Sequence, residues 1–266
     1  MSIVAGVDIG STASKAVILV DGKSVGQVVG ASSTNPKRTA CEIYEKALAE
    51  ASVDVSDVEL VVGTGYGRAQ VEFADRNISE ITCHGRGAHF LLPSVRMVID
   101  IGGQDTKAIC IDERGNLLDF AMNDKCAAGT GRFLEAMARS MELPIEQMGD
   151  HYFGEGDPCT ITSMCSVFAE SEVINLINDG VELPRIVKGL LLSLAGRVAS
   201  LSRRLGLVED IAMTGGVAKN QGVQRAIENK LKTKIKHFDG VDPQIVGALG
   251  AALIAADFAA GKTVVA

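Results

Sequence analysis

The sequence lacks long apolar runs, blocks of basic residues and low-complexity tracts. No window of 18 or more apolar residues occurs. The most apolar stretch, 245–256, is too short to cross a bilayer and is followed by Asp257. The formal net charge is −7, with no cluster of Arg or Lys, which argues against nucleic acid or an anionic membrane surface as the main partner. We therefore expect a globular protein that binds neither nucleic acid nor membranes.

The N-terminal residues also lack the basic segment of a secretory signal, and Asp8 interrupts the first apolar run. We expect a cytoplasmic protein, so its six cysteines should be thiols or metal ligands rather than disulfides. A chain of 266 residues with 47% hydrophobic content fits one large domain or two small ones.

Two segments, 7–17 and 99–109, are copies of each other at an offset of 92 residues. Each has an apolar run, then Asp-Ile-Gly, small polar residues, a Lys and further β-branched residues. This pattern predicts a β-hairpin whose turn can approach a phosphate, because Gly exposes backbone N–H groups and the preceding Asp can hold hydrated Mg²⁺. Asp-x-Gly turns also end ordinary hairpins, but an internal repeat favours a shared function.

The apolar periodicity predicts the remaining elements. Hairpins are expected at 3–9 with 16–20 and at 96–101 with 107–111, a strand at 60–62, and helices at 36–50, 131–143, 167–179, 184–205, 218–230 and 243–260. The Gly-rich segment 63–68 lacks the Gly-Lys-Ser/Thr end of a P-loop, so we interpret it as a hinge or loop near a nucleotide. The offset of the repeat predicts halves at 1–95 and 96–266, with helix 243–260 returning to pack on the first half.

A third motif, 211–220, is a short apolar strand followed by Gly-Gly and a helix start. In this order the three motifs resemble those of the actin, sugar kinase and Hsp70 superfamily of ATP-binding proteins. The resemblance implies an α/β fold of two related ribonuclease H-like halves, with the nucleotide in the cleft between them. It places Asp8 and Asp100 near Mg²⁺, Gly215 and Gly216 beside the adenosine, and these residues around the phosphates: Gly10, Ser11, Thr12, Lys15, Gly102, Gly103 and Gln104.

Cys126 and Cys165 each precede a predicted helix, for which Thr130 and Ser166 are expected N-caps. A Cys at a helix N-terminus meets the positive end of the helix dipole, which stabilises a thiolate. Two thiolates cannot complete a four-cysteine site, and a twofold dimer that contributes two from each chain would. Ordinary buried thiols are the alternative that spacing alone leaves open. The adjacent pair Cys83 and His84 does not by itself make a metal site.

The segments around both cysteines, 123–135 and 165–174, closely resemble those of the ATP-dependent activators of 2-hydroxyacyl-CoA dehydratases, a family that includes the ATPase subunits of benzoyl-CoA reductases. Segments 63–68, 80–85 and 99–105 match it as well, and the resemblance runs from about residue 3 to about residue 256. It implies a homodimer that holds one [4Fe–4S] cluster between its subunits, with Cys126 and Cys165 as ligands. Cys110 is expected in a strand core, and Cys159 lies outside the family motif.

By this resemblance, the protein is an oxygen-sensitive ATPase coupled to electron transfer. It would take one electron from ferredoxin or flavodoxin and pass it, driven by MgATP, to an iron–sulfur acyl-CoA dehydratase or reductase. Gln104 or Asp105 would position the attacking water, because both follow the second phosphate turn. A small-molecule kinase of the same superfamily and a non-redox nucleotide-binding regulator are the alternatives, and both leave the two cysteines unused. The motifs do not distinguish a dehydratase activator from a benzoyl-CoA reductase subunit, and they do not name the acyl-CoA.

Overall fold

The computed structural model describes residues 1–123, 126–162 and 165–263, and its framework is a pair of five-stranded mixed sheets. The first has the order β3-β2-β1-β4-β5 and the second the order β8-β7-β6-β9-β10. The strands are β1 (Ile3–Ile9), β2 (Ala13–Val20), β3 (Lys23–Ala31), β4 (Leu60–Thr64), β5 (Arg76–Asn77), β6 (Met97–Ile101), β7 (Thr106–Ile111), β8 (Leu117–Asn123), β9 (Ile211–Thr214) and β10 (Ile235–Lys236). The chain passes through the five strands in the same spatial order in both sheets, so the repeat seen in the sequence extends over the whole of each sheet.

Helices cover both faces of both sheets, which is why β1, β6 and β7 are apolar without alternation. The α-helices are α1 (Pro36–Ala51), α2 (Glu80–Leu91), α3 (Gly131–Ser140), α4 (Met148–His151), α5 (Ser166–Asn178), α6 (Leu183–Arg203), α7 (Gln221–Leu231) and α8 (Val246–Ala259). Short 3-10 turns lie at Val55–Asp57, Arg68–Gln70, Ile145–Gln147 and Gly216–Lys219. The expected α/β class is confirmed, and no helix in the described part of the chain is long and apolar enough to cross a membrane.

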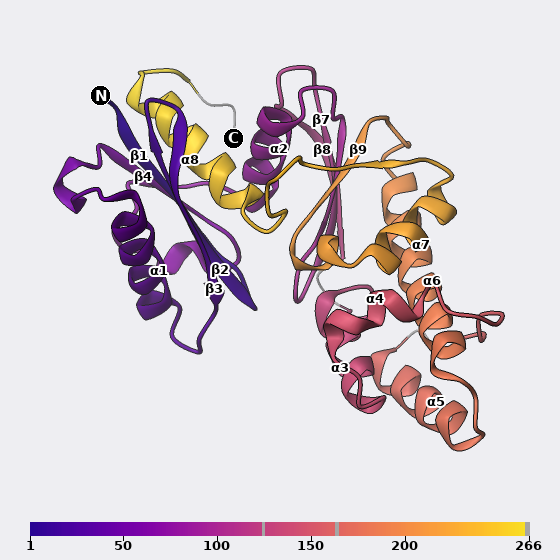
Figure 1. Cartoon of the computed structure of the whole chain (residues 1–266). Helices are drawn as coiled ribbons and strands as arrows, with labels where there is room; N and C mark the ends of the chain where they lie inside the picture. The colour runs from indigo at the N-terminus through magenta and orange to yellow at the C-terminus, as the bar shows by residue number, and fades with distance from the viewer. Residues whose placement is uncertain (124–125, 163–164, 264–266) are drawn as a thin grey trace.

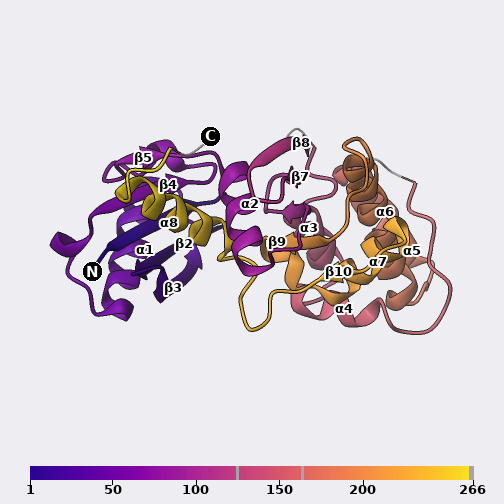
Figure 2. The same cartoon turned by 90° about the horizontal axis from the view of Figure 1, so that it is seen from above.

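The elements form successive layers (Figures 1 and 2). Helix α1 packs on one face of the first sheet and α8 on the other. Helix α2 lies between α8 and the second sheet, whose far side carries α6. At their crossing the backbones of α2 and α8 touch, because a Cβ on Gly250 would lie 1.8 Å from the carbonyl oxygen of Cys83. The last helix of the chain therefore covers the first sheet, and the helix that ends the first half covers the second.

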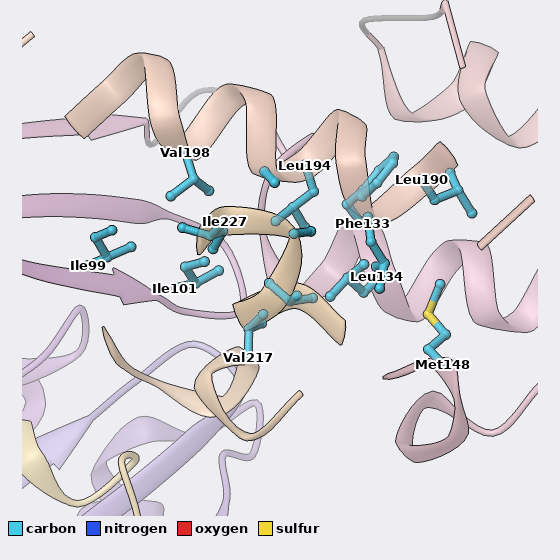
Figure 3. Close-up of a cluster of buried hydrophobic side chains, with 14 of the residues drawn as sticks. Ile99, Ile101, Phe133, Leu134, Met148, Leu190, Leu194, Val198, Val217 and Ile227 are labelled. Carbon is cyan, nitrogen blue, oxygen red and sulfur yellow. The ribbon is translucent and has the colours of Figure 1, made fainter. Parts of the chain in front are cut away.

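The largest core lies between the second sheet and the helices beyond it (Figure 3). Ile99 and Ile101 of β6 face Phe133 of α3, Leu194 of α6 and Ile227 of α7. Smaller cores lie between the first sheet and α1, between the first sheet and α8, and between α2 and the second sheet. Each sheet is thereby held rigid up to the ends of its central strands.

The structure adds strands and α-helices that were not predicted, namely β3, β5, β8, β10, α2 and α4. It also moves several boundaries, since α7 begins at Gln221 and α3 ends at Ser140. The expected N-cap at Ser166 was wrong: Cys165 has the extended backbone of the N-cap, and Ser166 is the first helical residue. Thr130 is the N-cap of α3, but its hydroxyl donates to the carbonyl of Ala127 rather than capping an N–H group.

Candidate functional site

Asp8 and Asp100 lie at equivalent places at the ends of the two central strands. Each carboxylate is buried, and each pairs with the lysine opposite it on the next strand of its hairpin. Lys15 Nζ lies 3.0 Å from Asp8 Oδ2, and Lys107 Nζ lies 3.4 Å from Asp100 Oδ2. Lys107 was not predicted to belong to the site, although the 92-residue offset maps Lys15 onto it.

The surroundings of Asp100 keep its carboxyl ionised. Burial acts to raise its pKa, but the charges of His84, Lys107 and Lys15 and the hydroxyl of Thr214 outweigh burial and lower the pKa to about 2. For Lys107, burial acts to lower the pKa, and the carboxylates of Asp100 and Asp105 outweigh it and raise the pKa. The floor of the site therefore carries fixed charges of both signs.

A glycine with positive φ stands against each of the two carboxylates. The parallel neighbours of the central strands, β4 and β9, end in Thr64 and Thr214, and the next residues are Gly65 (φ +88°) and Gly215 (φ +85°). A Cβ on Gly65 would lie 2.3 Å from Asp8 Oδ1, and one on Gly215 would lie 2.8 Å from Asp100 Oδ1. The segment 63–68 is thus the first-sheet counterpart of the Gly-Gly motif of the second sheet. This second internal repeat was not predicted from the sequence.

The two phosphate turns predicted from the sequence meet each other. A Cβ on Gly103 would lie 2.0 Å from Thr12 Oγ1, so the second turn lies directly against the first. The second turn is also bonded to α3, because the N–H groups of Gly131 and Arg132 donate to the carbonyls of Gly102 and Gly103 at 2.8 and 3.0 Å. The structure therefore brings the two copies of the repeat together.

One cavity of about 590 Å³ connects these groups. It contains all the residues predicted to bind nucleotide, namely Asp8, Gly10, Ser11, Thr12, Lys15, Asp100, Gly102, Gly103, Gln104, Gly215 and Gly216. Leu134, Ile145 and Val217 supply apolar walls, while Lys219 and Gln244, which hydrogen-bond to each other, supply polar ones. The size and mixed lining suit a nucleotide.

The two predicted catalytic side chains also line the cavity, and each is held by a cation. Asp105 Oδ1 accepts a hydrogen bond from Lys107 at 2.7 Å. With its amide oxygen toward Arg132, Gln104 accepts from both terminal nitrogens of that guanidinium, at 3.1 and 3.2 Å.

Cys126 and Cys165 are both exposed, and Cys165 caps α5. The backbone of Cys126 is fixed by Asn123, whose Nδ2 donates to the Cys126 carbonyl at 2.9 Å. Cys110 is buried in β7, as expected, and Cys83 is buried in α2. No group of three His, Cys, Asp or Glu side chains within the described residues could hold a metal ion. A four-thiolate site built on Cys126 and Cys165 therefore needs a second chain.

The chain is similar to proteins that share this whole architecture. The model of the BadF/BadG/BcrA/BcrD ATPase family matches residues 5–255. The activator of lactoyl-CoA dehydratase from Anaerotignum propionicum is 48% identical over 261 residues, 97% of this chain and 98% of that protein. The ADPNP-bound activator of 2-hydroxyisocaproyl-CoA dehydratase from Clostridium difficile superposes with a TM-score of 0.91 at 43% identity, over 99% of this chain and all of that one.

The fold extends to proteins of other activity. The ROK hexokinase of Thermus thermophilus matches with a TM-score of 0.54 at 15% identity, over 97% of this chain and 99% of that one, a likeness of fold alone. The expected actin, sugar kinase and Hsp70 type of fold is confirmed by these neighbours. The match over 5–255 and the identity over nearly the whole length show that the chain belongs to the BadF/BadG/BcrA/BcrD ATPase family.

Proposed function

We propose that this protein is an ATP-hydrolysing, iron–sulfur activator that passes single low-potential electrons to a partner acyl-CoA dehydratase. The proposal is supported by a relative named an activator of lactoyl-CoA dehydratase and by the similar structure of an activator with bound ADPNP. It is also supported by a cleft that suits MgATP and by two exposed cysteines outside that cleft.

The cleft residues fit a hydrated magnesium ion with nucleotide phosphates. Mg²⁺ prefers carboxylate oxygens and keeps several of its waters, and two buried carboxylates here line one cavity. Asp8 and Asp100 would hold the ion through water, the two turns with Lys15 and Gln104 would hold the phosphates, and Gly215 and Gly216 would flank the adenosine. Gln104 or Asp105 would orient the attacking water.

The cysteines fit a shared cluster. Both thiols are exposed, and Cys165 stands at the N-terminus of α5, where the helix dipole stabilises negative charge. Val167 and Phe168 in the next turn are each 67% exposed, and a second copy of the chain would cover this apolar surface. One [4Fe–4S] cluster per homodimer would, when bound, store the single electron that ferredoxin or flavodoxin delivers.

The observation that carries the coupling is the direct bonding between the cleft and the Cys126 segment. The carbonyls of Gly102 and Gly103 accept from the first N–H groups of α3, and Thr106 Oγ1 of β7 donates to the Gly129 carbonyl at 2.7 Å. Because residues 129–132 are bonded at three points to Gly102, Gly103 and Thr106, a displacement of the second phosphate turn by the nucleotide would move the segment that carries Cys126.

The test uses anaerobically purified protein with MgATP, reduced flavodoxin and a panel of 2-hydroxyacyl-CoA dehydratases. We expect brown protein with about four Fe per dimer and dehydratase turnover that requires ATP. Asp8→Ala should lose ATP hydrolysis and dehydratase activation while keeping its iron. Formation of a phosphorylated small molecule without any acceptor enzyme would contradict the proposal and favour a kinase. Activation of a benzoyl-CoA reductase but of no dehydratase would contradict the proposed class of partner.

A further inference from the structure

His84 of α2 is a buried side chain of the cleft whose charge helps to lower the pKa of Asp100, and it has been given no part in ligand binding above. It is 5% exposed and lines the same cavity as the two carboxylates. Its Nε2 atom lies 3.8 Å from Asp100 Oδ1. The imidazole thus extends from α2, which lies between the two sheets, to the end of β6 in the second sheet.

The imidazole also faces the carboxylate of the first sheet. Gly247 of α8 shows this, because a Cβ at that position would lie 2.9 Å from His84 Nε2 and 3.0 Å from Asp8 Oδ2. The two polar atoms therefore converge on one point beside α8. With Asp100 on its other side, His84 Nε2 stands between the two carboxylates that face the cavity.

No protein group in the described part of the chain satisfies this side chain by a hydrogen bond. The separation of 3.8 Å from Asp100 is too long for a direct hydrogen bond. The other ring nitrogen, Nδ1, is buried without a hydrogen-bond partner among the described residues. Buried polar groups are normally paired, so an imidazole that lines the cavity with no hydrogen bond to a described protein group points to something that occupies the cavity.

We propose that His84 is a positioning residue that hydrogen-bonds to the water shell of the magnesium ion held by Asp8 and Asp100. The inference rests on the function proposed above. Contact through water is expected, because Mg²⁺ takes oxygen ligands and keeps several of its waters, whereas the imidazole offers only nitrogen. Mg²⁺ keeps several waters when protein carboxylates bind it, and a group that orients such waters stabilises the ion without touching it.

The competing explanation is that His84 only neutralises Asp100 inside the fold. The two roles differ in what they require of the side chain. A positioning role requires a hydrogen-bonding atom at the place of Nε2, which Gln can supply. A neutralising role requires positive charge, which Gln lacks. They also differ in readout, because loss of neutralisation lowers the stability of the protein without nucleotide, whereas loss of positioning weakens Mg²⁺ binding.

The experiment measures binding of ADP to the anaerobic dimer by calorimetry, in EDTA and over a series of MgCl₂ concentrations. For His84→Leu we expect the Mg²⁺ concentration at half effect to rise about tenfold, a typical effect of an outer-shell partner, with ADP binding in EDTA unchanged. His84→Gln should restore the wild-type value. If His84→Leu does not fold, His84→Asn replaces it, since its shorter amide leaves the place of Nε2 empty.

His89→Leu is the matched control. His89 lies on the same helix with an equally unpaired Nδ1, but it packs against Gly115 away from the cavity. This variant should keep the wild-type response to Mg²⁺. An unchanged response in His84→Leu overturns the inference alone. Equal losses in His84→Leu and His84→Gln, with lowered melting temperatures in the absence of nucleotide, overturn it in favour of charge neutralisation. ADP binding by the wild type that ignores Mg²⁺ overturns the proposed magnesium site itself.

Discussion

Gly65 and Gly215 occupy equivalent positions in the two sheets, one residue beyond the ends of β4 and β9. Both have positive φ, and each lies so close to a cleft carboxylate that a Cβ could not be accommodated without displacing it. The positions of the Asp8 and Asp100 carboxylates therefore require glycine at residues 65 and 215.

Gly65→Ala and Gly215→Ala should therefore weaken ADP binding at least about tenfold, because the added methyl group displaces Asp8 or Asp100. Gly180→Ala is the control, since Gly180 also has positive φ (+75°) but has open space around its Cβ position. It should cost about 1 kcal/mol of stability from backbone strain alone and leave ADP binding unchanged. An ADP dissociation constant equal to that of the wild type in both cleft variants, measured by calorimetry, would show that glycine is not required at these positions.

Asp100 makes stability depend on pH in the acid range. Its folded pKa of about 2 lies below the ordinary value of about 4, so its ionised form stabilises the folded protein at pH values above about 4. That stabilisation is lost as the pH falls from about 4 toward 2. Asp100→Asn should show a shallower loss of melting temperature over this range than the wild type. Melting temperatures that fall equally with pH in the wild type and in Asp100→Asn, measured by calorimetry, would contradict a lowered pKa of Asp100.

The proposed cluster predicts which thiols hold iron. Cys126→Ser and Cys165→Ser should each lose the iron and the visible absorption, because the site needs four thiolates from two chains. ADP binding should persist in both, since neither thiol lines the cleft. Cys41→Ser is the control, an equally exposed cysteine on α1, and should keep its iron. Full iron in either of the first two variants would exclude that residue as a ligand.

Thiol reactivity should separate the cysteines by burial. Burial raises the pKa of Cys83 to about 12, so its thiol stays protonated at neutral pH. Iron-free protein treated with iodoacetamide should be labelled at the exposed cysteines 41, 126 and 165 and should remain unlabelled at Cys83 until it is unfolded. Mass spectrometry of peptides gives the order in which the cysteines are labelled. Labelling of Cys83 together with the exposed cysteines would mean that α2 unfolds locally in the native protein.

The dimer should depend on the apolar surface beside Cys165. Phe168 is 67% exposed, and Phe168→Asp places a charge where the proposed second copy packs. Analytical ultracentrifugation of iron-free protein should then show a dimer dissociation constant raised at least tenfold. Val55→Asp, at a residue that is 61% exposed on the far part of the first half, should leave the constant unchanged. Equal constants in all three proteins would place the interface elsewhere.

The repeat in the sequence was sufficient to predict both hairpins, because similar turns fold locally, and the residues expected to bind nucleotide after Asp8 and Asp100 line one cavity. Edge strands β3 and β8 escaped prediction, since exposed apolar residues such as Phe120 break the alternation of a half-buried strand. Helix α2 escaped because Gly85 and Gly87 lower its helix propensity, while its glycines serve close packing. The position of His84 beside the cleft carboxylates could not be predicted from the sequence, because Asp8 and Asp100 come together only in the folded chain.

Helix α8 follows all the other described helices in the chain, yet it supplies one wall of a core of the first sheet, packing residues 245–255 against Val4, Val17, Leu19 and Val62. On the ribosome, at roughly 5–20 residues per second, the first sheet waits on the order of ten seconds or more with one apolar face uncovered. The first half therefore cannot complete its core before α8 has been made. A chain truncated before α8 leaves the ribosome with one face of this sheet uncovered, which makes it a target for aggregation or proteolysis.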